Sequence, residues 1–233
     1  MQDDCQQADG SRWPSIRRRS LADEVTDQLR DVILTGGLQP ADHVGEVEIS
    51  QRLRVSRGPV REALVRLEQE GLVSSELHRG ATVVDFARAD IAQLATLRVA
   101  LEELAMSEAA RNATDADLAK LDDVVERMRS VRTTDAEISL VRLDVEFHDL
   151  VYQTARHDRL YAAWATIRSQ VTLSLLRRRV LNQDYAALVV DEHAALASTL
   201  ASRDAAQARS EATVHVQGAY TRLLAAYDGK GFK

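Results

Sequence analysis

The chain has 233 residues, a formal net charge of −6 at pH 7 and a single cysteine, Cys5. One cysteine excludes an intrachain disulfide and favours a reducing compartment. The first twenty residues contain no apolar core of the signal-peptide type, and no apolar run approaches the roughly 18 residues of a membrane span. The sequence therefore predicts a soluble, cytoplasmic protein that does not enter a membrane.

Helix-breaking residues divide the chain near residue 86. All three prolines occur before residue 60, and neither glycine nor proline occurs from Ala81 to Gln217. Such a stretch, rich in Ala, Leu, Arg and Glu, predicts stacked helices. We expect a disordered leader over residues 1–15, a small domain over residues 16–86, an all-helical domain over residues 87–228 and a tail over residues 229–233.

The small domain shows three helical segments followed by two strands. Ser20 can cap a first helix whose apolar residues repeat every four positions up to Ile33 and which ends at Gly36-Gly37. A second helix is expected over residues 46–53, and a third begins around Pro59 after a tight turn. Alternating residues over 72–76 and 81–85 predict a hairpin. This order predicts a winged helix-turn-helix, in which the third helix enters the major groove of DNA.

The third helix carries two arginines on its exposed face. Arg57 and Arg61 lie four residues apart, opposite an apolar stripe that includes Leu64 and Leu67. Guanidinium groups suit the acceptors of guanine and phosphate. Between residues 52 and 66 there are five arginines and one acidic residue, Glu62, so this acidic protein carries a local positive patch. From this window alone, a solvated amphipathic helix remains the alternative interpretation.

The third helix and the first strand form one long motif, Val55-Ser56-Arg57-x-Pro59-Val60-Arg61-Glu62-Ala63-Leu64-x-Arg66-Leu67-Glu68-x-Glu70-Gly71-Leu72-Val73, followed by Arg79-Gly80. This motif resembles the GntR family of bacterial transcription regulators. The resemblance implies that Arg57 and Arg61 contact operator bases or phosphates and that the wing tip reaches the minor groove. The expected DNA-binding residues are Ser56, Arg57, Gly58, Arg61, His78, Arg79 and Gly80. Two positions depart from the family pattern: Gly58 lacks the usual hydroxyl, and Val47 replaces an arginine that some members use.

Six helical segments separated by polar capping clusters predict an antiparallel six-helix bundle in the second domain. The expected segments are residues 89–111, 114–132, 135–156, 158–182, 184–201 and 204–227. Together with the first domain, this makes a mainly α protein. Bundles of this size can hold a ligand between their helices.

Four polar residues in the bundle are candidate metal ligands. Asp144 and His148 lie four apart and share a helix face, although such a pair is more often an ordinary surface or capping pair. His193 and His215 lie 22 residues apart, with a turn predicted at their midpoint, residue 204. An αα-hairpin folded there would bring both rings level, facing one interior point. Two satisfied core histidines are the alternative interpretation.

The bundle sequence contains Leu97-Arg98-x-x-Leu101-Glu102, Asp144-x-x-x-His148, His193 and His215. This set is similar to the motifs of the FCD effector domain of the FadR subfamily, and the number of six helices resembles its VanR-like branch. The resemblance implies a divalent cation such as Zn, Ni or Mn held by these Asp and His residues. It also implies a small carboxylate effector that completes the coordination, with Arg98 facing the pocket. His43 and His157 match no ligand position and are expected to be structural.

These features predict a homodimeric transcription regulator, a repressor by analogy, whose binding to double-stranded operator DNA responds to a small organic acid. A metal-dependent enzyme is the rival class, because three histidines and an aspartate can leave a metal position open for water. No general acid or base accompanies these ligands, and an enzyme would not explain Arg57, Arg61 and the wing. A purely structural metal, or an acyl-type ligand without a metal, is a third possibility.

Overall fold

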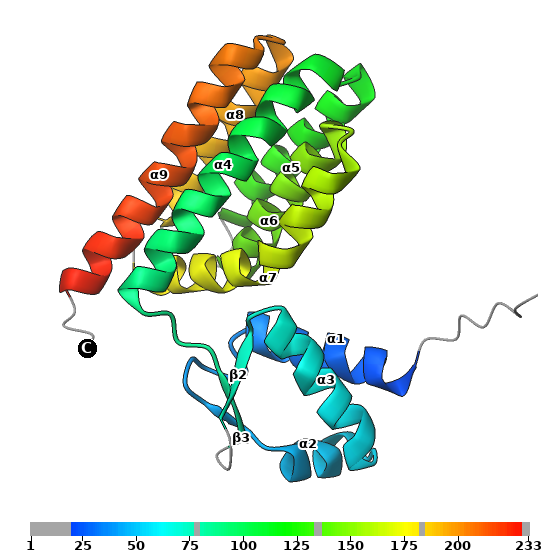
Figure 1. Cartoon of the computed structure of the whole chain (residues 1–233). Helices are drawn as coiled ribbons and strands as arrows, with labels where there is room; N and C mark the ends of the chain where they lie inside the picture. Colours follow the sequence, from blue (N-terminus) through cyan, green and yellow to red (C-terminus); the bar gives the residue numbers. More distant parts are fainter. Residues whose placement is uncertain (1–19, 77–79, 133–136, 182–184, 230–233) are drawn as a thin grey trace, which may run out of the picture.

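The computed structural model describes residues 20–76, 80–132, 137–181 and 185–229. A small N-terminal body and a larger helical bundle follow one another along the chain (Figure 1). The elements of the small body are α1 Leu21–Leu34, β1 His43–Val44, α2 Glu46–Leu53, α3 Arg57–Gln69, β2 Val73–Glu76 and β3 Gly80–Val83. The bundle consists of α4 Arg88–Asn112, α5 Asp115–Arg132, α6 Glu137–Thr154, α7 Asp158–Leu181, α8 Tyr185–Ala201 and α9 Ala205–Gly229.

Local signals set the ends of the N-terminal helices. Ser20 and Asp23 form a reciprocal capping box that satisfies two free N–H groups at the start of α1. Arg54 ends α2 in the left-handed region, at φ 55°, which turns the chain sharply into α3. Ser56 is the N-cap residue of α3, but its side chain makes no capping hydrogen bond. Among the described residues, the α3 N-terminus therefore has uncapped N–H groups and a Ser56 hydroxyl that makes no hydrogen bond.

The wing is part of a three-stranded antiparallel sheet with the order β1-β3-β2. The predicted hairpin is confirmed, with Val73 opposite Val83 and Glu76 opposite Gly80. The sequence interpretation missed β1, because a strand of two residues leaves no alternating pattern to detect. His43 of β1 pairs with Thr82, which brings an imidazole beside the wing.

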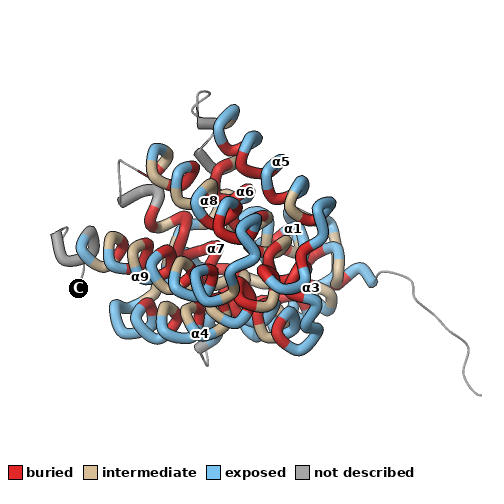
Figure 2. The backbone as a smooth tube through the Cα atoms, turned by 90° about the horizontal axis from the view of Figure 1, so that it is seen from above, coloured by how far each residue is buried: buried red, intermediate tan, exposed pale blue. Residues whose placement is uncertain are grey.

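Each body has its own apolar core. The N-terminal core contains the predicted inward residues of α1 and α3, including Val25, Ile33 and Leu67. The bundle core is larger and draws on all six helices, whose buried faces point inward (Figure 2). The prediction of a mainly α chain, with a winged helix-turn-helix and six bundle helices, is confirmed, and each predicted bundle helix differs from the observed one by a few residues at most.

Helix α7 crosses the end of the bundle that faces the N-terminal body (Figure 1). Its Leu173 is buried as a member of the N-terminal core. One turn earlier, the Ser169 hydroxyl donates to Glu70 Oε2 at 3.2 Å, and Glu70 is the C-cap residue of α3. A Cβ at Gly71 would come within 2.6 Å of the Gln170 side chain. Side chains of α7 are therefore packed directly against the end of α3.

Candidate nucleic-acid interface and metal centre

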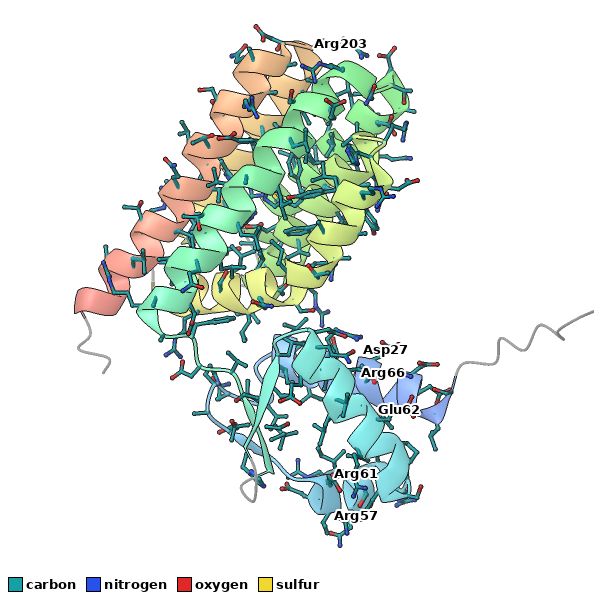
Figure 3. The ribbon with its side chains drawn as sticks, viewed as in Figure 1. Asp27, Arg57, Arg61, Glu62, Arg66 and Arg203 are labelled. Atoms are coloured by element: carbon teal, nitrogen blue, oxygen red, sulfur yellow. The ribbon has the colours of Figure 1, made fainter. Side chains whose placement is uncertain are left out.

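The predicted DNA-reading arginines lie at the N-terminal end of α3. Arg57 and Arg61 are labelled in Figure 3 at the end of the small body that points away from the bundle. Their side chains are 60% and 64% exposed, so their guanidinium groups can meet another molecule. The adjacent Gly58 is also exposed, and a Cβ there would meet no atom within 4 Å.

Glu46 at the start of α2 links the two arginines. Its carboxylate accepts from Arg57 Nη2 at 3.0 Å and from Arg61 Nε and Nη2 at 3.0 and 3.1 Å. These two hydrogen-bonding partners keep the pKa of Glu46 below its usual value. The contacts hold both guanidinium groups at the same edge of the domain, confirming that they project together.

A groove with a volume of about 690 Å³ opens between this edge and the wing, and it is lined by Arg57 and Arg61 on one side and by His43 and Gly80 on the other. Gly80 has φ +80°, and a Cβ there would lie 2.8 Å from His43 Cε1. Glycine is therefore required where β3 begins. The predicted wing-tip residues His78 and Arg79 lie outside the described residues.

The local positive charge is smaller in the structure than the sequence window predicts, because acidic side chains lie beside the arginines. Arg66 pairs with Glu62 at 2.6 Å and also with Asp23 of α1, and Arg52 pairs with Glu48 at 2.7 Å. With the contacts of Arg57 and Arg61 to Glu46, acidic residues on the same or neighbouring helices thus engage four of the five arginines. Arg57 and Arg61 remain the most exposed basic pair on the groove.

The four predicted metal ligands come together in the bundle core. His148, His193 and His215 offer nitrogen atoms that all lie within 4.8 Å of one another. Asp144 Oδ1 lies 3.5 Å from both His148 Nε2 and His193 Nε2. All four side chains are buried, His215 being the most accessible at 6%. The turn predicted around residue 204 does bring His193 and His215 level, with ring centroids 5.0 Å apart.

Hydrogen bonds at the outer ring nitrogens orient two of the imidazoles. His148 Nδ1 contacts the buried carboxylate of Glu102, and His193 Nδ1 lies 2.6 Å from the carbonyl oxygen of Val189. Both oxygens accept, so both Nδ1 atoms donate and both Nε2 atoms carry a lone pair. A carboxylate behind a ligating histidine is a common support of protein metal sites.

The inward-facing atoms have the spacing of a coordination shell. Bonds of about 2.1 Å at the tetrahedral angle separate neighbouring ligand atoms by roughly 3.4 Å. His148 Nε2 and His215 Nε2 are 3.3 Å apart, close to the two aspartate distances. Asp144 Oδ1 and His193 Nε2 have no hydrogen-bond partner among the described residues. These two buried atoms offer lone pairs without a hydrogen-bond partner, which fits ligands of a divalent cation.

Burial also selects the protonation state that binds metals. It lowers the pKa of His148, and it lowers the pKa of His215 well below the usual value with the help of the neighbouring imidazoles. Both rings are therefore neutral at pH 7. Neutral imidazole is the form in which histidine ligates a metal.

Arg98, the predicted effector residue, lies beside this centre on α4 with 1% of its surface exposed. Its Nε atom is 3.6 Å from Glu102 Oε2, the same carboxylate that supports His148. Nε and Nη2 have no hydrogen-bond partner among the described residues. Arg98 therefore offers buried donors next to the proposed metal ligands.

Several residues around the centre were missed by the sequence interpretation. Glu102 formed part of the quoted motif but received no role, although its spacing from Arg98 indicated a pair on one helical turn. Tyr185 donates to Asp144 Oδ2 at 3.3 Å, and Tyr152 donates to Glu102 Oε2 at 3.3 Å. Arg178 is buried nearby. Of the histidines set aside, His157 accepts from the backbone N–H of Leu160 at the start of α7, a structural role.

Comparison with known proteins follows the same division of the chain. Residues 21–83 match the model of the bacterial regulatory proteins of the gntR family, and residues 93–218 match the FCD domain. No helix in the described ranges has the length and apolar character needed to cross a membrane.

An uncharacterised HTH-type transcriptional regulator of Mycobacterium tuberculosis is 36% identical over 151 residues, which cover 65% of this chain but only 59% of that protein. The gluconate operon transcriptional repressor of Bacillus subtilis is 25% identical over 84% of this chain and 81% of its own length. Among solved structures, E. coli McbR/YncC superposes with a TM-score of 0.78 at 22% identity, covering 90% of this chain and all of that one. The matched families are regulatory rather than enzymatic, and the chain belongs to the gntR family of bacterial regulatory proteins, with an FCD domain as its helical bundle.

Proposed function

We propose that this protein is a transcription regulator, acting as a repressor, whose binding to operator DNA is controlled by a small carboxylate effector at a metal centre. One observation carries the proposal: the chain joins an exposed arginine pair on α3 to a buried centre of oriented, unsatisfied ligand atoms. The relative named as a gluconate operon repressor supports the repressing mode. Such a protein acts in the cytoplasm, where operator DNA is found.

The DNA-binding role falls to the start of α3 and to the wing. Arg57 and Arg61 would exchange their contacts with Glu46 for guanine or phosphate acceptors, which match the planar guanidinium fork. The unused hydroxyl of Ser56 and the exposed backbone at Gly58 suit a phosphate at the helix N-terminus. Gly80, together with His78 and Arg79, would bring the wing to the minor groove.

The metal-binding role falls to Asp144, His148, His193 and His215. One oxygen and three nitrogen ligands accept Zn, Ni or Mn. A divalent ion bound there would attract a carboxylate, and Arg98 supplies buried guanidinium donors at the same place.

Helix α7 offers a physical route between the two sites. On its bundle side, Trp164 stacks on Tyr152 with centroids 4.8 Å apart, and Tyr152 hydrogen-bonds Glu102, which supports His148. On its other side, Ser169 and Leu173 contact the N-terminal body. An effector that favours one position of α7 would thereby favour one placement of α3.

A homodimer fits this function, because two-fold operators pair with two-fold proteins. Leu97 and Leu104, two turns apart on one face of α4, are 47% and 38% exposed. We propose that this face meets a second copy. Light scattering of a Leu97→Glu, Leu104→Glu variant should then report a monomer, whereas an unchanged dimer mass would assign the interface to another face.

The DNA-binding proposal is tested with an Arg57→Ala, Arg61→Ala variant and the DNA upstream of its own gene. Two contacts of this kind predict a loss of about 2–5 kcal/mol in binding free energy. Arg127→Ala is the matched control, because Arg127 pairs with Glu146 on the bundle surface. Unchanged operator affinity in the double variant would show that α3 does not read DNA.

The metal proposal is tested by elemental analysis of the purified protein beside a His193→Ala, His215→Ala variant. We expect close to one divalent ion per chain in the wild type and a large loss in the variant. Equal metal content in both proteins would exclude the site.

A further inference from the structure

Arg178 of α7 is a buried arginine that has no role in the proposed metal coordination. It is 2% exposed, and its guanidinium carbon lies 5.2 Å from the ring centroid of Tyr185. Tyr185 in turn donates to Asp144 Oδ2 at 3.3 Å. Arg178 Nη2 makes a long contact of 3.4 Å with Glu192, and its Nε has no hydrogen-bond partner among the described residues. A buried charge with unused donors next to a ligand site needs an explanation.

Arg178 and Arg98 share one cavity although they come from different helices. Both line a small space between α4, α7 and α9, together with Ser174 and Tyr220. Arg98 contributes two further nitrogens, Nε and Nη2, that make no hydrogen bond with the described residues. Within the described ranges, Arg98 Nη2 and Arg178 Nε have no acceptor and Arg98 Nε has only the long ion pair with Glu102, which indicates anionic groups as the missing partners.

The balance of charge specifies how much negative charge the ligand brings. Around the centre, the buried cations Arg98 and Arg178 are matched by the buried carboxylates Glu102 and Asp144. Glu192 and Arg222 pair with each other at its edge. Because histidine ligates a metal in its neutral form, these charged groups balance one another and a bound divalent ion adds two positive charges. Buried charge without compensation is strongly unfavourable.

We infer that the effector is a small organic dianion, with one carboxylate at the metal and Arg98 and a second anionic group at Arg178. This inference rests on the proposed function. It goes further by giving the ligand class and a second anchoring residue on α7, the helix that contacts the N-terminal body. The cavity has a volume of about 10 Å³, roughly that of one water molecule. A dianion must therefore open the space beside α7 as it enters.

The test compares ligand affinities by calorimetry on the full chain, loaded with one divalent metal and freed of excess metal. Malonate, succinate and glutarate are the two-headed probes, propionate and butyrate are the one-headed probes, and inorganic phosphate is a compact dianion. Ionic strength is held constant. We expect at least one dicarboxylate to bind ten-fold or more tightly than either monocarboxylate and than phosphate. We expect this preference to disappear in metal-free protein, because the excess charge is then absent.

Variants at Arg178, with a control at Arg159, locate the second anionic group. Arg178→Met should bring the dicarboxylate affinity down to that of the monocarboxylates, with a much smaller loss of monocarboxylate affinity. Arg159→Met, which removes an exposed arginine from the same helix, should change neither affinity. Arg178→Lys retains the charge and should keep part of the preference if the methionine variant does not fold.

The outcomes separate this inference from the proposed function. Equal affinity for one-headed and two-headed probes, both lost in Arg98→Met, would overturn the dianion and leave a carboxylate effector site. Phosphate binding as tightly as the best dicarboxylate would overturn the two-headed ligand. An unchanged dicarboxylate preference in Arg178→Met would overturn the role of Arg178. No binding of any probe to metal-loaded protein would overturn both the inference and the effector proposal.

Discussion

Replacement of Glu102 by glutamine tests whether the residues behind His148 support a metal centre. The Glu102 carboxylate accepts from His148 Nδ1 and Tyr152 and faces Arg98 at 3.6 Å, with no exposed surface. A glutamine keeps the shape but has one accepting oxygen, so its NH₂ group must face one of these donors. It also removes the negative charge that increases the basicity of the imidazole. Changes of this kind lower metal affinity by about 10–100-fold, or about 1.4–2.7 kcal/mol.

The assay is competition for one metal ion between the protein and a chelating dye at constant pH. Glu103→Gln is the matched control on the neighbouring residue, whose carboxylate accepts from Thr213 Oγ1 and Arg209 at the bundle surface. The control should bind metal as the wild type does. Wild-type metal affinity in Glu102→Gln would refute the reasoning, because it would mean that the contact between Glu102 and His148 does not prepare a ligand.

Three further predictions concern the N-terminal body. Gly58→Ser should tighten operator binding beyond Gly58→Ala in a fluorescence anisotropy titration, because both variants favour the helix and only serine adds a hydroxyl in open space; equal affinities would count against a phosphate there. Val47 is 51% exposed beside the groove. Val47→Arg should steepen the slope of log operator affinity against log salt concentration by about one unit, and an unchanged slope would show that this position does not contact DNA. Hydrogen bonds from Arg66 lower the pKa of Asp23 to about 2 from 3.8, so Asp23 stabilises the fold above pH 3.8 and this contribution is lost as the pH falls towards 2. Urea unfolding should show that Asp23→Asn loses less stability than the wild type as the pH falls from 3.8 towards 2. Parallel curves of unfolding free energy against pH for the two proteins would contradict this cause.

Periodicity and helix breakers were sufficient to predict most of the fold. The 22-residue spacing of His193 and His215 about a turn near residue 204 predicted their convergence, because an αα-hairpin maps positions at equal distance from the turn onto the same level. The spacing of Asp144 and His148 likewise predicted a shared face. These are relations within one helix or one hairpin, which a sequence expresses directly.

Contacts between separate helices could not be predicted in the same way. Glu102 supports His148 across 46 positions of sequence, and no local pattern joins α4 to α6. Arg178 lies in a run of three arginines that suggests an exposed surface, yet it is buried. The count of positive charge around α3 also missed Glu46 and Asp23, because these residues reach the arginines from neighbouring helices.

The most direct test of control by the buried centre measures operator affinity with the metal and the effector probe present or absent. Binding to the upstream DNA would be followed for metal-free protein, metal-loaded protein and metal-loaded protein with succinate, beside the His193→Ala, His215→Ala variant. We predict that succinate changes operator affinity by ten-fold or more only in metal-loaded wild type, with the variant binding DNA equally under all three conditions. Control of DNA binding by the buried centre would be contradicted if elemental analysis and calorimetry show metal and succinate bound to the wild type but neither changes its operator affinity.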